Sequence, residues 1–317
     1  MNMLMKNYVS SLVGGALARC LALAVLASTT LPAAETGRTF ATPEDAVAAL
    51  VSAVQTTNPA GLRALFGAAG EELVNPDAAQ AAQEFAEFSS ALKETNHLAR
   101  ETETRRVLEL GKSGWPFPVP IVQREGRWCF DTSAGVEEVA NRRIGRNELE
   151  TLKAVRAYVQ AQREYASRDR DGDEVLEYAQ KITSSPGLKD GLYWPPELDG
   201  EVSPLGPVIA AAARKGYRQE LNAGEAPQPF HGYYFKILTR QGVHAPGGKY
   251  NYVINGNMIG GFALVAWPAE HGETGLMTFM VNQQGRVYQK DLGPDTTKAA
   301  EGMKTYDPDS TWSVSAD

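Results

Sequence analysis

The chain has 317 residues, a formal net charge of −7 at pH 7 and 43% hydrophobic residues. That length and composition suit a globular protein of about two domains. The acidic balance argues against a nucleic acid or an anionic membrane as the partner, because either would require clustered Lys and Arg. Arg142, Arg143 and Arg146 form a dense basic cluster, which we interpret as a solvated helix end.

The first 34 residues have the order of a secretory signal peptide. Lys6 and Arg19 form a basic leader, residues 20–27 are apolar, and small residues provide a cleavage site near Ala33 or Ala34. The alternative is an uncleaved anchor helix, but the apolar run is far shorter than the ~20 residues of a membrane span. We therefore expect a periplasmic or secreted mature protein without a membrane span.

Cysteine usage follows from this cleavage. Cys20 leaves with the leader, so the mature chain keeps only Cys129 and forms no intramolecular disulfide. No histidine lies near Cys129 in the sequence to activate its thiol. We predict a buried, inert thiol.

Residues 35–140 are predicted to form an N-terminal α+β domain, because helical patterns precede short apolar runs with a turn between them. Thr42-Pro43-Glu44-Asp45 combines a cap, a proline and two acids, as the first turn of a helix does. The expected elements are helices at 43–54, 59–66 and 77–99 and strands at 105–110 and 119–131, with a turn at 125–126.

Residues 141–317 are predicted to form a second α+β domain, and we place the boundary between Thr132 and Asn147. A long amphipathic helix opens this domain, an irregular segment rich in Gly and Pro follows, and an antiparallel meander ends it. The expected elements are helices at 147–166 and 207–215 and strands at 233–238, 250–254, 262–267 and 276–281.

Several segments resemble DUF2950, a bacterial family of exported proteins of unknown function. The resemblance covers almost all of the mature chain and implies no reaction or catalytic residue. The segments are Phe117–Val122 with Gly126–Thr132, then Arg143–Leu149, Tyr193–Pro195, Gly232–Phe235 and Gly260–Ala269.

The C-terminal half is also similar to the globular heads of type IV pilins and pseudopilins. The segments are Gln162–Ala166, Gly232–Phe235, Gly261–Ala266, Thr278–Asn282 and Gly285–Tyr288. Pilins begin with an apolar assembly helix, whereas here a whole domain precedes the helix and Lys153, Arg156 and Arg163 decorate it. The resemblance therefore implies a pilin-head-like fold without a filament.

A cluster of carboxylates is the strongest candidate for a metal-binding site. Asp169, Asp171 and Asp173 alternate around Gly172, and such carboxylates can converge on calcium, which takes six to eight oxygens. The spacing does not match an EF-hand loop, and the alternative is a charged turn that ends a helix. We predict calcium as the bound metal, if there is one, and no other cofactor.

Other patterns point to structure as readily as to function. His97, His231, His244 and His271 lack zinc spacing, although the last three fall in loops of one predicted sheet. The glycine-rich segments 245–248 and 255–261 open no helix, so we interpret them as turns. The aromatic run 193–196 fits either a carbohydrate or peptide groove or packing over the sheet.

The leading functional hypothesis is a non-enzymatic exported protein that binds or assembles with a protein or a cell-surface polymer. The chain has no Gly-x-Ser-x-Gly nucleophile motif. The alternative is an enzyme or small-ligand carrier with a pocket in the N-terminal domain or between domains. A deep pocket that holds a carboxylate or histidine of perturbed pKa would favour this alternative.

Overall fold

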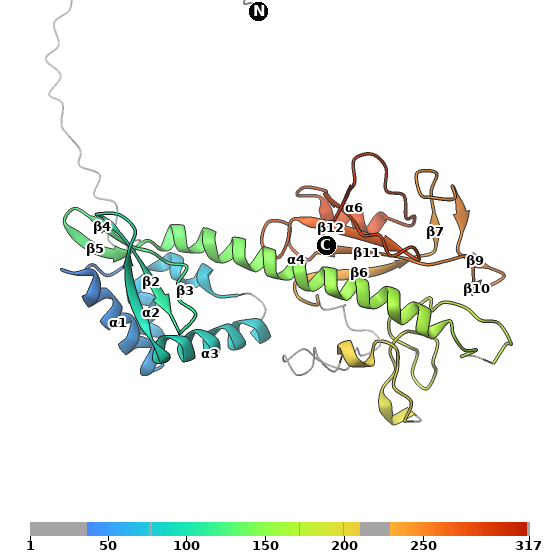
Figure 1. Ribbon diagram of the computed structural model, residues 1–317, viewed down its shortest axis with the longest axis horizontal. Helices are drawn as coiled ribbons and strands as arrows, with labels where there is room; N and C mark the ends of the chain where they lie inside the picture. Colours follow the sequence, from blue (N-terminus) through green and yellow to red (C-terminus); the bar gives the residue numbers. More distant parts are fainter. Residues whose placement is uncertain (1–36, 76–77, 171, 199, 210–228, 316–317) are drawn as a thin grey trace, which may run out of the picture. The chain divides into compact units, whose positions relative to one another are not determined.

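A computed structural model describes residues 37–75, 78–170, 172–198, 200–209 and 229–315 (Figure 1). The predicted leader, residues 1–34, lies outside the described residues. The fold is α+β, as the sequence predicts, and its sheets are antiparallel. Among the helices of the described residues, none combines the length and the apolar character that crossing a bilayer requires.

The N-terminal elements are helices followed by one sheet. They are α1 (Pro43–Gln55), α2 (Pro59–Phe66), the 3-10 helix η1 (Ala68–Leu73), α3 (Ala78–Glu94), β1 (Asn96–Arg100), β2 (Arg105–Leu110), β3 (Trp115–Pro116), β4 (Ile121–Arg124) and β5 (Arg127–Phe130). The strand order is β1-β2-β4-β5, and β3 pairs with β2. The cap predicted for α1 is present and takes the form of a capping box: Thr42 Oγ1 accepts from the Asp45 amide at 3.2 Å, and the Asp45 carboxylate accepts from the Thr42 amide.

The third helix is shorter than its sequence pattern predicts. It ends at Glu94 rather than near residue 99, because residues 96–100 form β1 and pair with residues 106–110 of β2. Helices α1 and α2 pack on this sheet around a buried core that includes Leu50, Leu108 and Ile121. The predicted burial of Cys129 is confirmed, and burial raises the pKa of its thiol.

The long helix α4 (Thr132–Tyr165) begins directly after β5, fifteen residues before the predicted start at 147. Two buried contacts hold the early turns. The Thr132 hydroxyl donates to the Phe66 carbonyl at 2.8 Å, and Gly135 approaches Val119 closely. The segment in which we placed the domain boundary is therefore helical. The described residues form two hydrophobic clusters, one on each side of this segment in the sequence, and the division into domains stays a prediction.

The C-terminal elements form a five-stranded sheet and two small ribbons. The sheet has the order β14-β13-β12-β11-β6, and α6 packs on β11 (Figure 1). The elements are β6 (Tyr233–Leu238), β7 (Arg240–Gln241), β8 (Tyr250–Asn251), β9 (Val253–Ile254), β10 (Asn257–Met258), β11 (Ala263–Pro268), β12 (Met277–Asn282), β13 (Tyr288–Asp291), α6 (Thr296–Gly302) and β14 (Ser313–Val314). The strand expected at 250–254 is split, because β8 pairs with β7 whereas β9 pairs with β10.

The second half of α4 lies on this sheet. Every residue of β11 is buried, and Val155 and Val159 of α4 belong to the same hydrophobic cluster as the strand. The Tyr158 hydroxyl donates to the Ala263 carbonyl at 3.2 Å. Of the helix expected at 207–215, residues 206–209 are helical and the remainder lies outside the described residues.

We predict that Gly135→Ala lowers the free energy of unfolding by about 1–3 kcal/mol. A Cβ at this position would lie 2.6 Å from Val119 Cγ2 and 3.0 Å from Val119 Cβ, so α4 and the strand entry would have to separate. This cost outweighs the roughly 1 kcal/mol by which alanine favours a helix over glycine. Urea unfolding of the purified protein measures the difference.

Gly145→Ala in the same helix is the matched control. No atom lies within 4 Å of the Cβ that this substitution adds, so it should raise stability by about 0.4–1 kcal/mol. Equal stabilisation by both substitutions would show that the close contact of α4 at Gly135 is absent.

Candidate functional site

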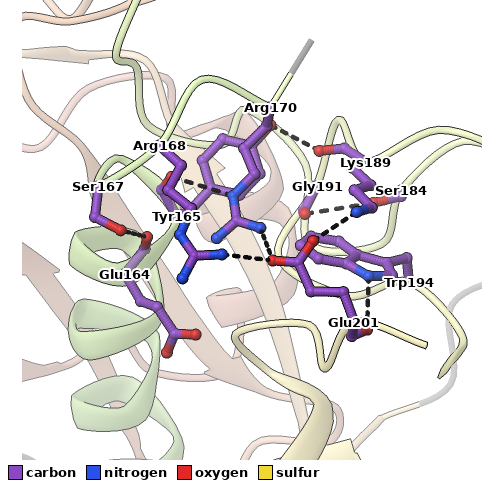
Figure 2. Close-up of polar contacts among 10 residues, drawn as sticks. All are labelled: Glu164, Tyr165, Ser167, Arg168, Arg170, Ser184, Lys189, Gly191, Trp194 and Glu201. Carbon is purple, nitrogen blue, oxygen red and sulfur yellow. Dashed lines mark hydrogen bonds and ion pairs between the residues drawn. The ribbon is translucent and has the colours of Figure 1, made fainter. Parts of the chain in front are cut away.

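A dense charged cluster is centred on Glu201, which follows the 3-10 helix η2 (Pro196–Leu198) (Figure 2). Its carboxylate contacts Arg170 NH1 at 2.7 Å and Lys189 Nζ at 2.5 Å, and Arg168 NH1 lies 3.4 Å away. Arg168 and Arg170 follow α4, and Lys189 lies in the irregular segment predicted after residue 184. One carboxylate thus joins three separate stretches of chain.

Two aromatic rings complete the cluster, and one of them, Trp194, belongs to the aromatic run found in the sequence. The Arg170 guanidinium lies 5.2 Å from the Trp194 ring centroid and 5.6 Å from that of Tyr165. The Trp194 indole donates to the Glu201 carbonyl at 3.1 Å, and its ring is 1% exposed. Tyr193 is also buried. Packing, rather than an open groove, is the role of these rings.

The electrostatics of this cluster suit a structural role, in which an ionised carboxylate holds segments of the chain together. Lys189 and then Arg170 hold the pKa of the Glu201 carboxyl below its usual range through hydrogen bonds. A general acid needs the opposite shift, towards neutral pH. Because the partners lie 12 to 33 residues away in the sequence, no local spacing could have predicted them.

The predicted calcium ligands are only partly described. Asp169 accepts hydrogen bonds from the Gly172 and Glu174 amides at 2.7 and 2.9 Å, one on each carboxylate oxygen. Asp173 accepts from the Val175 amide and from Asn257 Nδ2. Asp171 lies outside the described residues. The structure gathers no metal-binding group of three His, Cys, Asp or Glu from the residues it describes, and calcium stays a prediction.

Asp173 also belongs to a set of contacts that hold the β9–β10 hairpin. Asn257 Nδ2 donates to its carboxylate at 2.7 Å, the Met258 amide donates to Glu177 at 2.9 Å, and Gln180 Nε2 donates to the Gly256 carbonyl at 2.6 Å. The hairpin turn itself is Asn255-Gly256, both with positive φ, which is the two-residue turn that suits a tight hairpin. The predicted turn at this glycine-rich segment is confirmed.

The histidines have different surroundings. His244 Nδ1 lies 3.0 Å from Asp307, whereas His271 Nε2 lies 2.7 Å from Asp291. His231 is buried beside Phe230, and His97 is exposed on β1. The structure therefore assigns the loop histidines to separate contacts.

The basic cluster 142–146 is not the solvated helix end that the sequence suggested, because it lies in the middle of α4. Arg142 donates to Glu138 and to the Pro116 carbonyl, and Arg146 NH1 lies 2.6 Å from Glu84. Arg143 is buried, with 5% of its side chain exposed. The sequence signal that could have shown this is the spacing of Arg143, Asn147 and Thr151, four residues apart on one helix face.

The residues after Arg143 bind the loop between β11 and β12. Asn147 Nδ2 donates to the Thr274 carbonyl at 2.9 Å. The Glu148 carboxylate accepts from the Leu276 and Met277 amides, each at 3.0 Å. Gly232 must be glycine here, because its φ is +71° and a Cβ would lie 2.8 Å from Asn147 Nδ2. α4 thus holds this loop through polar contacts.

Comparison with known proteins places the chain in a family. The model of the family described as "Protein of unknown function (DUF2950)" matches residues 37–314. The chain belongs to the DUF2950 family. Neither the curated proteins nor the solved structures contain a match.

The sequence resemblance to DUF2950 is therefore confirmed, whereas the likeness to pilin heads stays a prediction. In this DUF2950 protein the match includes Glu201 with Arg168, Arg170 and Lys189, the β9–β10 hairpin, and the polar residues of α4. The family description assigns no reaction to any of them. Their roles have to be argued from their contacts.

We predict that Glu201→Gln lowers the free energy of unfolding at pH 7 by about 2 kcal/mol, the scale of a hydrogen bond to a charged group. The amide keeps the shape but leaves the buried Arg170 without its anion. Because folding lowers the pKa of Glu201 below 4.5, this stability is present above that pH and is lost as pH falls through the folded-state pKa. The gap between wild type and variant should therefore shrink in acid.

Urea unfolding of both proteins at pH 7 and at lower pH measures this gap. Glu164→Gln is the control, because Glu164 is exposed near the end of α4 and should change stability by less than about 0.5 kcal/mol. A gap that stays constant down to pH 3 would show that the Glu201 carboxylate is not what stabilises the cluster.

Proposed function

We propose that this DUF2950 protein is exported, loses residues 1–34, and acts through non-enzymatic contacts with another protein in the periplasm or cell envelope. The observation that supports this proposal is a set of exposed aliphatic side chains, which we call the hairpin surface, on the β9–β10 hairpin and on the segment 173–180 that is hydrogen-bonded to it. Leu176, Ile254 and Ile259 are 59%, 46% and 45% exposed. Scattered apolar residues on a surface need no explanation, but these three share two segments that are bonded together.

The contacts beneath these side chains make the surface rigid. The Tyr178 amide donates to the Met258 carbonyl at 2.9 Å, next to the bond from the Met258 amide to Glu177. Met258 itself is fully buried, and its backbone joins the hairpin to the segment that carries Leu176. A preorganised surface loses less conformational entropy on binding, which favours affinity.

The chemistry of the surface favours a protein over a polymer as partner. Tyr193 and Trp194, the rings that the sequence offered for a carbohydrate groove, are buried. Leu176, Ile254 and Ile259 are aliphatic, and the central part of a protein interface buries such groups.

We predict that a photo-reactive residue at Ile259, in protein expressed with its own leader in the natural host, forms a discrete adduct with another protein. The adduct should appear in the periplasmic or secreted fraction, and its DUF2950 part should lack residues 1–34. Leu176→Asp together with Ile254→Asp should lower the adduct yield about tenfold, as expected for the loss of an interface anchor. Mass spectrometry identifies both components.

A photo-reactive residue at Glu125, exposed in the turn between β4 and β5, is the control. Equal adducts at Glu125 and Ile259 would indicate collision rather than binding. An adduct with a polysaccharide instead of a protein would overturn the choice of partner, and a full-length mass would overturn export by cleavage.

Calcium at Asp169, Asp171 and Asp173 is a further proposal for this protein. A ligand that binds only the folded state stabilises it by ~2.7 kcal/mol at a hundredfold excess over Kd. Melting temperature should therefore rise with millimolar calcium, rise less with magnesium, and not change in Asp171→Ala. Identical melting with calcium and with a chelator would leave the aspartates as a charged turn.

A further inference from the structure

Arg143 is a buried cation whose side chain makes no hydrogen bond with the residues that the structure describes. Its side chain is 5% exposed, and its Nε is sealed from solvent with no partner. NH1 lies 3.7 Å from Glu273 Oε2, beyond hydrogen-bond distance. Of the sealed side-chain atoms that lack a partner in the described part of the chain, Arg143 Nε is the one that belongs to an ionised group.

A buried charge without hydrogen bonds lowers the stability of the folded protein. A guanidinium keeps its proton in proteins, so it cannot escape burial by becoming neutral. A buried charge normally has both a counterion and hydrogen bonds. The neighbouring Arg142 and Arg146 show the usual solution, because each donates hydrogen bonds at 2.8 Å or less to acceptors of the chain.

The loop beside Arg143 is held by α4, whereas the side chain of Glu273 on that loop is exposed. Asn147 and Glu148 fix the backbone of the loop that carries Glu273, through bonds to Thr274, Leu276 and Met277. The Glu273 side chain is 61% exposed, so it can turn into solvent while the loop stays in place. The guanidinium would then lack its carboxylate partner.

We propose that Arg143 binds a monoanionic carboxylate, supplied by a small organic acid or by the C-terminus of a peptide. The planar guanidinium matches the two oxygens of a carboxylate, and one such group would supply both the missing charge and the missing acceptors. A dianionic phosphate would face the nearby Glu273. The site shares no residue with the hairpin surface of the proposed function, so either can fail without the other.

The test measures the melting temperature of the mature protein with added sodium acetate, and with acetyl-alanyl-alanine against its C-terminal amide, at constant ionic strength. We expect a saturable rise with acetate and no rise with the amide. A lower Kd for the free-acid peptide than for acetate would identify a peptide C-terminus as the source, and an equal Kd a small organic acid. Inorganic phosphate should raise the melting temperature less than acetate does.

Two substitutions separate a ligand site from a structural residue. Arg143→Met should abolish the rise while the melting temperature without anion stays equal or increases, because an apolar side chain of similar volume replaces a buried charge that lacks hydrogen bonds. Arg142→Met, whose parent side chain already donates to Glu138 and to the Pro116 carbonyl, should keep the rise. Glu273→Gln should lower the Kd for acetate about fivefold, since it removes a partly exposed competing charge.

Three results would overturn the proposal. One is an equal rise in Arg143→Met and wild type, which would be a general salt effect. Another is a large loss of stability in Glu273→Gln with no change in the Kd, which would make Glu273 the structural counterion of Arg143. The third is a rise with the peptide amide equal to that with the free acid.

Discussion

The helix α4 is 34 residues long, and its buried residues pack against different parts of the protein along its length. Its buried face contacts Phe66 and Val119 at the start and the apolar core around β11 at the end. Between them the buried residues are polar, namely Arg143, Asn147 and Thr151. Buried polar groups are normally hydrogen-bonded, and the loop between β11 and β12 supplies a carbonyl to Asn147. Among the described residues, Arg143 Nε and Thr151 Oγ1 find no such partner.

Ionised acids meet similar requirements elsewhere in the chain. Glu148 accepts two backbone amides, Asp169 accepts two more, and Glu201 joins Arg170 to Lys189. A hydrogen bond to a charged group contributes about 1.5–3 kcal/mol, which is large against a total stability of about 5–15 kcal/mol. Their hydrogen bonds within the fold are enough to explain why these acids are present. Groups that the fold leaves unsatisfied are better guides to binding, and Arg143 and the exposed aliphatic residues of the hairpin are such groups.

Local rules predicted the elements whose signals are contained in a few neighbouring residues. The capping box of α1, the end of α2 at Gly67 and the Asn255-Gly256 hairpin turn follow from backbone preferences within one turn. These local rules failed where residues far away in the sequence determine the secondary structure. Residues 96–100 form a strand because β2 pairs with them, and the strand expected at 250–254 splits because its two ends pair with different ribbons.

The sequence alone determined the α+β class, the family, the burial of Cys129 and the positions of most helices and strands of the described residues. The family follows from the resemblance of several segments, and the others depend on composition, on a local motif or on the period of apolar residues. Tertiary structure decided that Arg143 is buried, that Glu201 holds three cations, and that Trp194 packs inside rather than lining a groove. The physical reason is that charge pairs and burial depend on which distant segments meet in space, and neither spacing nor propensity along the chain records that.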